Sequence, residues 1–156
     1  MAEARVVRAS EGDRYGPSPL FKDGKLTGAP FDFLVVELGY GEGPPLHVHA
    51  EQYDTFYVLD GVLTVQIGDN RLELTAGDYA SVPPGVPHAF DNTRKDQPPV
   101  KVLNLMNPGG LDEFFVILKK EGGDRRAFEA AAAKCGVKIV GPPLVPANKD
   151  AAAARG

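Results

Sequence analysis

Residues 41–61 read GEGPPLHVHAEQYDTFYVLDG, and this stretch indicates the fold of the chain. It contains two of the three histidines in 156 residues, His47 and His49, and an aspartate, Asp54, on the next apolar run. Residues two apart on a β-strand point to the same face of a sheet, so both imidazoles can face inward together. Glycines and prolines before them favour turns. The stretch therefore predicts two short strands that direct potential metal ligands into the interior.

The third histidine lies in a second stretch of similar texture, GDYASVPPGVPHAFDN, residues 77–92. His88, Phe90 and Asn92 share strand parity, and the glycines and prolines before them supply turns that can bring this strand to the first one. Two neighbouring imidazoles, a third from a distant strand and one carboxylate suit Fe, Mn, Ni, Co or Zn. Because all three histidines fit this pattern, the sequence favours one divalent metal site over scattered core histidines.

Short apolar runs separated by glycine and proline surround both stretches, and they predict the strands of an antiparallel sandwich or barrel. The runs cover residues 5–9, 31–38, 55–61, 62–68, 71–77, 79–85, 88–92 and 100–106. Between two of them, Gly68-Asp69-Asn70 predicts a sharp hairpin turn. The fold class expected from these runs is all-β.

The pattern changes after Pro108. Residues 111–120 and 124–136 predict helices, the second with Asp124 as N-cap and Gly136 as its C-terminal stop. Residues 137–146 predict a short extended segment, and the small, polar tail 146–156 predicts a disordered end. We find no internal repeat. Residues 1–145 are therefore expected to form one domain, with a motif core at 41–92 and a helical region at about 110–136.

Composition narrows the classes of function. The 17 basic and 21 acidic residues give a net charge of −4 and are interspersed, which argues against a nucleic-acid partner. The sequence shows neither a signal-peptide pattern nor an apolar run of roughly 20 residues, so it predicts a soluble, cytoplasmic protein without a membrane partner. The single cysteine, Cys135, excludes an intrachain disulfide and a cysteine-rich zinc module. Cys135 itself is expected to be a small packing residue rather than a nucleophile.

Together the two stretches resemble the paired motifs of the cupin superfamily, G-x5-HxH-x3,4-E-x6-G and G-x5-PxG-x2-H-x3-N, at every position except the glutamate, which here is Asp54. The flanking segments 26–38, 111–118 and 135–143 resemble single-domain cupins labelled quercetin 2,3-dioxygenase-like. This resemblance implies a double-stranded β-helix, or jelly-roll barrel, of six to eight conserved strands with short C-terminal helices. It also implies a metal bound by the positions of His47, His49, Asp54 and His88, and a homodimer.

The aspartate is the departure from the family pattern that bears on chemistry. Its side chain is one methylene shorter than glutamate, so its oxygens lie about 1.5 Å further back. Either the strand moves inward and Asp54 binds the metal directly, or Asp54 acts through a water beside a site of three histidines. In quercetinase-like enzymes the glutamate accepts the proton of the substrate hydroxyl, which assigns Asp54 the corresponding catalytic role by resemblance.

Four functions remain open from the sequence. The first is a dioxygenase acting on a small aromatic or enolic substrate. The second is a cupin isomerase, cyclase or lyase that uses the metal as a Lewis acid without redox. The third is a small-molecule-binding cupin, which the absence of a helix-turn-helix pattern or basic arm makes less favoured, and the fourth is a storage cupin, against which the three histidines argue.

Several apolar side chains can line a substrate pocket, although the same residues suit a plain core equally well. These candidates are Val36, Phe56, Phe90, Met106 and Phe115. Tyr79 is expected to pack with its hydroxyl at the surface. Glu51, the nearest other carboxylate, lies outside the motif frame and is expected to be a solvated charge.

Overall fold

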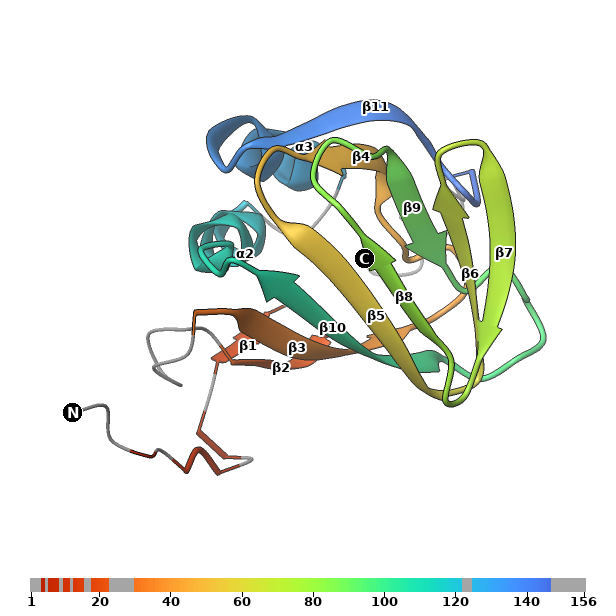
Figure 1. Ribbon diagram of the computed structural model, residues 1–156, viewed down its shortest axis with the longest axis horizontal. Coiled ribbons are helices and arrows are strands. Elements are labelled where there is room, and N and C mark those ends of the chain that lie inside the picture. Colours follow the sequence, from red (N-terminus) through yellow and green to blue (C-terminus); the bar gives the residue numbers. More distant parts are fainter. Residues whose placement is uncertain are drawn as a thin grey trace.

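The computed structural model describes residues 4, 6–8, 10–11, 13–15, 18–22, 30–121 and 125–146. In these ranges the chain forms two antiparallel β-sheets and two helices (Figure 1). The elements are β1 (Asp13–Tyr15), β2 (Ser18–Lys22), β3 (Asp32–Leu38), β4 (Pro45–His49), β5 (Tyr53–Asp60), β6 (Val62–Ile67), β7 (Asn70–Thr75), β8 (Tyr79–Val82), β9 (His88–Asp91), β10 (Val100–Asn107), α2 (Asp112–Lys120), α3 (Arg125–Lys134) and β11 (Val137–Pro143).

From β3 onward the chain passes repeatedly between the two sheets, and only β6 and β7 follow each other in the same sheet. The six-stranded sheet has the order β1-β2-β3-β10-β5-β8, and the five-stranded sheet has the order β11-β4-β9-β6-β7. Strand β10 returns from the end of the motif core to lie between β3 and β5, and β11 adds to the edge of β4. This order places β4 and β9, which carry the three histidines, side by side in one sheet, and β5 in the sheet that faces them (Figure 1).

Apolar side chains alternate along the strands and fill the space between the sheets. In β5 the buried residues are Asp54, Phe56 and Val58, while Tyr53 and Tyr57 are exposed on the other face. A strand with one face on the core and one toward solvent shows this alternation. The interior cluster also includes Leu34, Val36, Leu38, Leu63, Val65, Val82, Val100, Val102 and Met106.

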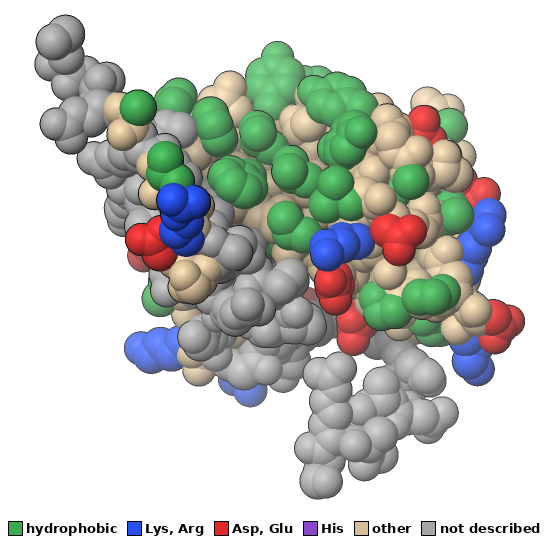
Figure 2. All heavy atoms as spheres, turned by 90° about the horizontal axis from the view of Figure 1, so that it is seen from below, with side chains coloured by type: hydrophobic (Ala, Val, Ile, Leu, Met, Phe, Trp, Pro, Cys, Tyr) green, Lys and Arg blue, Asp and Glu red, His purple; other side chains and the backbone are tan. Residues whose placement is uncertain are grey.

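The outer face of the six-stranded sheet is unusually apolar for a solvent-facing surface. Tyr53, Tyr57 and Leu59 of β5 and Tyr79 of β8 are each at least 40% exposed. Figure 2, which views the molecule from below Figure 1, shows hydrophobic side chains gathered on this side. An ion pair between Lys101 and Glu37 lies on the same face.

Tight turns connect the strands where the sequence places glycine. Gly68 has a φ of 57° and no non-glycine residue described here has a positive φ, so the β6–β7 hairpin has the single positive φ of a type II′ turn. Gly61 has a φ of 85° and alone separates β5 from β6, so the chain changes sheets within one residue. A Cβ at this glycine would lie 3.2 Å from Val100. The turn predicted at Gly68-Asp69-Asn70 is confirmed.

The two helices cover one end of the sandwich (Figure 1). The start of α2 is fixed from a distant strand, because Asp32 of β3 accepts hydrogen bonds from the amides of Gly110 and Leu111 at 2.6 and 3.1 Å. Backbone amides at the start of a helix have no hydrogen-bond acceptor within the helix, so a side chain from elsewhere can bind them. Helix α3 ends at Lys134, and Gly136 two residues later has the positive φ expected of its predicted stop.

The all-β class with C-terminal helices is confirmed, and so are the strands predicted from residue 31 onward. The strand predicted at residues 5–9 is wrong in its described part: residues 6–8 form no strand. Instead, the amide of Arg8 donates to the carboxylate of Glu11, whose own amide donates to the carbonyl of Arg8. This local turn uses backbone groups that a strand would need for pairing.

The packing predicted for Tyr79 is also wrong. Tyr79 is 64% exposed, because β8 is an edge strand and Val82, of opposite parity, takes its inward face. The predicted N-cap, Asp124, lies outside the described residues, as does the predicted disordered tail except for Pro146, and the extent of the domain remains a prediction. In the described part of the chain, neither helix has the length and apolar character required to cross a bilayer.

Candidate metal centre

Four side chains from three strands converge between the sheets. His47 and His49 come from β4, Asp54 from β5 and His88 from β9, and one ligand atom of each lies within 4.8 Å of the others. Antiparallel pairing sets His47 directly opposite His88, and strand parity turns His49 to the same side as His47. All four residues are at most 5% exposed. The structure therefore brings together all four of the predicted ligands, within one buried site.

The distances around Asp54 match those expected between ligands of a single ion. Asp54 Oδ2 lies 3.1 Å from His88 Nε2 and 3.4 Å from His49 Nε2. Two atoms bound at about 2.1 Å to one metal lie about 3.0 Å apart at a right angle and about 3.4 Å apart at a tetrahedral angle. Asp54 Oδ2 is therefore close enough to the two imidazole nitrogens for all three atoms to bind one metal ion directly, although the aspartate side chain is shorter than a glutamate.

Backbone carbonyls orient two of the imidazoles. His47 Nδ1 lies 2.7 Å from the carbonyl oxygen of Pro45, and His88 Nδ1 lies 2.9 Å from that of Val86. A carbonyl oxygen only accepts hydrogen bonds, so each Nδ1 carries the proton and donates it. In the neutral rings, each Nε2 then has a lone pair available for a metal, as in many metal-binding histidines.

Without a cation, the site has two unsatisfied features. Both ring nitrogens of His49 are buried without a hydrogen-bond partner among the described residues. Since His88 Nδ1 is the donor to Val86, His88 Nε2 can donate to Asp54 only when the ring is protonated. In the neutral ring a lone pair would face a carboxylate. A cation bound between these atoms would satisfy both features, so the residues fit a metal ion.

The electrostatics of the site favour the protonation states that bind metals. Burial alone would raise the pKa of Asp54, but its contacts with the rings of His49 and His88 outweigh burial and lower the pKa below its usual range. Burial, together with the positive charge that His88 and His49 can carry, lowers the pKa of His47 to about 3. A carboxylate and a neutral imidazole are the ligand forms that metals require.

Aromatic residues lie close to the histidines. The ring of Phe128, from α3, has its centroid 6.0 Å from that of His47, and the ring of Phe56 lies 6.4 Å from that of His88. Phe90 packs on Phe56 with centroids 4.6 Å apart. The sequence did not single out Phe128, because only the packing of α3 against β11 brings it near β4.

The predicted pocket residues are dispersed over several elements. Val36 and Met106 are buried in the core, and Met106 is paired across the strands with Asp54. Phe115 is partly buried on α2, with its ring against Phe114. Their role in lining a substrate pocket remains a prediction. Glu51 is exposed, as predicted for a solvated charge.

Asn104 is a polar residue at the site that the sequence reasoning missed. It lies in β10, is 5% exposed, and donates a hydrogen bond to Asp54 Oδ1. The alternation of residues along this strand did indicate an unusual position, because the polar Asn104 lies on the same face as the apolar Val102 and Met106. Its partner, however, depends on the pairing of β10 with β5, which the sequence does not show.

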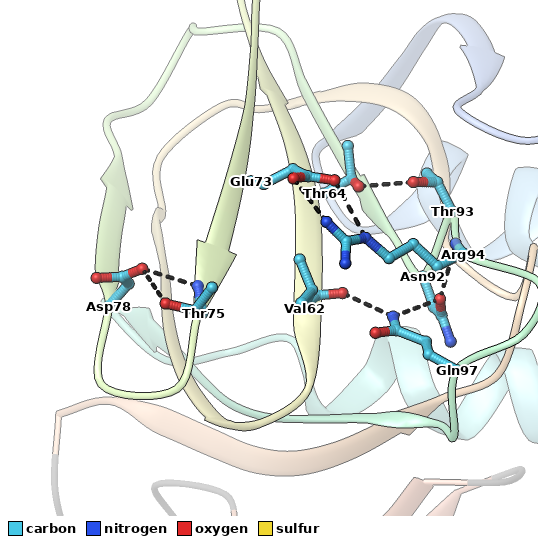
Figure 3. Close-up of polar contacts among 9 residues, drawn as sticks. All are labelled: Val62, Thr64, Glu73, Thr75, Asp78, Asn92, Thr93, Arg94 and Gln97. Carbon is cyan, nitrogen blue, oxygen red and sulfur yellow. Dashed lines mark hydrogen bonds and ion pairs between the residues drawn. The ribbon is translucent and has the colours of Figure 1, made fainter.

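The asparagine of the second motif has a structural role (Figure 3). Asn92 is fully buried, and its Oδ1 accepts hydrogen bonds from the amide of Arg94 and from Gln97 Nε2, at 3.0 and 2.6 Å. Gln97 also donates to the carbonyl of Val62, and the Arg94 guanidinium forms an ion pair with Glu73 (Figure 3). These contacts fix the segment between β9 and β10 on the edge of the barrel, away from the histidines.

Asp91 is a third buried aspartate, in addition to Asp32 and Asp54. Its Oδ1 accepts a hydrogen bond from the amide of Gly43 at 3.0 Å, and its Oδ2 has no hydrogen-bond partner among the described residues. Burial raises the pKa of Asp91 to about 6, against the opposing effect of the Gly43 amide. In Asp91, unlike Asp54, the effect of burial therefore outweighs the hydrogen bonds that favour the charged form.

The two-sheet barrel and the buried cluster of three histidines and one carboxylate define a cupin-type protein. Residues 34–106 match the family described as the cupin domain. The chain therefore carries a cupin domain, and the resemblance drawn from its two motifs is confirmed.

Within this family the chain is similar to quercetin 2,3-dioxygenases. It is 35% identical to that of Bacillus subtilis (strain 168) over 89 residues, which are 54% of this chain and 26% of the relative. It is 31% identical to that of Aspergillus japonicus over 83 residues, 50% of this chain and 23% of the relative. The chain thus spans about a quarter of the length of these two curated relatives.

Solved structures support the fold. The crystal structure of a cupin protein from Bacteroides fragilis has a TM-score of 0.55 and 19% identity, and the likeness covers 70% of this chain and 88% of that one. At this identity the likeness concerns the fold alone.

Proposed function

We propose that the chain binds one divalent transition metal through His47, His49 and His88, with Asp54 as the fourth ligand. The main support is the arrangement around Asp54 Oδ2, which lies 3.4 and 3.1 Å from the Nε2 atoms of His49 and His88. The unpartnered, buried ring of His49 adds to it. The same nitrogen and oxygen donors suit Fe, Mn, Ni, Co and Zn, so the choice among these depends on availability and geometry.

The proposed activity is a quercetinase-like dioxygenation of a small aromatic or enolic substrate. Its support is the similarity to two quercetin 2,3-dioxygenases, combined with the buried metal-binding set. The bound metal would polarise a substrate oxygen as a Lewis acid and, if redox-active, would take part in the reaction with O₂. Asp54 would supply the base: its pKa lies below the usual range, so it is ionised at neutral pH, and a bound metal would make the substrate hydroxyl acidic enough to give its proton to so weak a base. A substrate hydroxyl within hydrogen-bond reach can transfer its proton to Oδ2.

Oxygen uptake with a flavonol tests this activity. The purified protein is loaded in turn with each of the five metals, and at least one redox-active metal is expected to give O₂ consumption that occurs only when flavonol is present. Asp54→Ala should abolish the uptake, because both a ligand and the base are lost. Glu51→Gln is the matched control: this variant removes an exposed carboxylate three residues away and should leave the uptake unchanged. If no metal-loaded form showed flavonol-dependent uptake, the dioxygenase proposal would be wrong.

A non-redox cupin isomerase, cyclase or lyase is the second candidate. The specific observation in its favour is that the nitrogen and oxygen donors of the site suit Zn, which has no redox chemistry and can expand from four to five ligands when a substrate oxygen binds. Zinc-loaded protein that converts an enolic substrate under anaerobic conditions would select this function. Loss of that conversion in Asp54→Ala would assign the proton transfer to the same carboxylate.

The homodimer and the cytoplasmic location are proposals as well. The outer face of the six-stranded sheet supports a dimer, since Tyr53, Tyr57, Leu59 and Tyr79 are exposed on it (Figure 2). Exposed apolar patches on sheet faces often mark contacts between chains. Light scattering should give twice the 16.6 kDa chain mass, and Tyr57→Lys should reduce it to the single chain.

A further inference from the structure

We infer that Asn104 is a positioning residue of the proposed metal centre. Its side chain binds one oxygen of Asp54, so that only the other oxygen faces the histidines. This inference rests on the proposed metal binding and goes beyond it, because it assigns a function to a residue that is outside both cupin motifs.

The contacts of Asn104 fix its side chain in one orientation. Its Nδ2 donates to Asp54 Oδ1 at 2.5 Å and to the carbonyl of Thr55 at 3.0 Å. Both acceptors belong to β5, and Asn104 is paired with Phe56 on that strand. A flipped amide would set its oxygen against a carboxylate and a carbonyl, which cannot donate. The donor therefore points at Asp54.

The position of Asn104 in β10 also requires an explanation. Its neighbours on the same strand face, Val102 and Met106, are 1% and 2% exposed and belong to the hydrophobic core. An amide at such a position loses its hydration and must find hydrogen-bond partners inside the protein. Asp54 provides the charged partner, and hydrogen bonds to charged groups are among the stronger ones.

The two oxygens of Asp54 consequently have different tasks. Oδ1 is occupied by Asn104, whereas Oδ2 lies 3.4 and 3.1 Å from the Nε2 atoms of His49 and His88. Without Asn104 the carboxylate could turn about its last torsion and present either oxygen or both. Because the side chain is one methylene shorter than the glutamate of the cupin pattern, its reach depends on this orientation.

Copper binding to the Asn104→Leu variant tests the inference. Cu²⁺ serves as the probe because it binds nitrogen ligands most tightly among the divalent first-row metals, and both its affinity and its electron paramagnetic resonance can be measured. Competition with a chelator should show a dissociation constant about 10- to 100-fold above that of the parent protein, the size of effect typical when a group that orients a ligand is lost. The copper hyperfine coupling should change as well.

Thr64→Val is the matched control. Thr64 is also buried in the barrel, but its hydroxyl bonds to Thr93, so this variant loses a buried hydrogen bond without touching Asp54. Its copper affinity and spectrum should equal those of the parent. If Asn104→Leu did not fold, Asn104→Ala would replace it, since alanine removes the amide donor without adding bulk or charge beside Asp54, and the same loss of affinity is expected.

A double-mutant cycle separates positioning from general structural support. In the Asp54→Ala background three imidazoles still bind Cu²⁺, and Asn104→Leu should cause no further loss of affinity. An equal loss in both backgrounds, or unchanged copper binding by Asn104→Leu in the parent background, would overturn the inference while leaving the metal centre intact. A parent protein that binds no copper would overturn the proposed metal centre itself, and the inference with it.

Discussion

Replacing His49 with leucine should stabilise the metal-free protein and remove most of the stabilisation that a metal provides. Both ring nitrogens of His49 are buried without a hydrogen-bond partner among the described residues, in a site where the residue is 5% exposed. A buried polar group without a partner costs about 1–3 kcal/mol. Leucine has a similar volume and no polar atom, so this cost disappears in His49→Leu. The variant also loses the 3.4 Å approach of Nε2 to Asp54 Oδ2, which is not a hydrogen bond, and Asp54 keeps its hydrogen bonds to His88 and Asn104.

The expected change in melting temperature follows from the size of the chain. For domains of about 150 residues, 1 kcal/mol shifts the melting temperature by roughly 2–4 °C, so His49→Leu should melt roughly 2–12 °C higher in the presence of a chelator. With metal at about 1,000 times its dissociation constant, the parent gains about 4.1 kcal/mol. The variant lacks one ligand and gains far less. The order of the two melting temperatures should therefore reverse when metal is added.

Thermal melts in chelator and in excess Ni²⁺ measure both effects, and His88→Leu provides the contrast. His88 Nε2 lies 3.1 Å from Asp54 Oδ2, and its Nδ1 donates to Val86, so leucine at this position leaves both partners unsatisfied. His88→Leu should therefore melt below the parent even in chelator. If His49→Leu also melted well below the parent in chelator, the unpartnered imidazole would not be a cost to the metal-free fold, and the reasoning would be refuted.

Three further predictions concern groups away from the metal ligands. The raised pKa of Asp91 contributes stability that is present below pH 3.8 and is lost as the pH rises through about 6. The stability of Asp91→Asn relative to the parent, measured by urea unfolding, should therefore increase by up to roughly 3 kcal/mol between pH 3.5 and pH 7.5. A difference that stays constant over this pH range would contradict the prediction. Asn92→Ala should lower the stability by about 2–4 kcal/mol, because this buried side chain loses its hydrogen bonds to Gln97, to the Arg94 amide and to the carbonyls of Leu38 and Pro98, while metal content measured by mass spectrometry stays that of the parent. Gly43→Ala would place a Cβ 1.9 Å from the carbonyl oxygen of Phe90, so it should melt at least several degrees below the parent, and a parent-like melt would show that this backbone can shift.

The sequence predicted the features that depend on local spacing. Alternation along a strand was enough to place His47 and His49 on one face, and the glycine and proline spacing predicted turns, including the one at Gly68, whose φ is positive. These features depend on residues a few positions apart, so a single sequence contains them.

Features that depend on the packing of distant strands could not be read in the same way. The 3.1 Å approach of Asp54 to His88 is set by how β5 and β9 lie in opposite sheets, which the length of the aspartate side chain alone left open. The exposure of Tyr79 depends on β8 being an edge strand, and the contact of Asn104 with Asp54 depends on the pairing of β10 with β5. Each of these requires the strand order, and the strand order is a property of the whole fold.

The central claim is that four side chains bind one metal ion, and a crystal structure of the protein loaded with Co²⁺, with anomalous data at the cobalt edge, tests it most directly. We expect a single anomalous peak about 2.0–2.2 Å from the Nε2 atoms of His47, His49 and His88 and from Asp54 Oδ2. A fully loaded crystal with its cobalt bound elsewhere, or with Asp54 more than about 3 Å from the ion, would contradict the account.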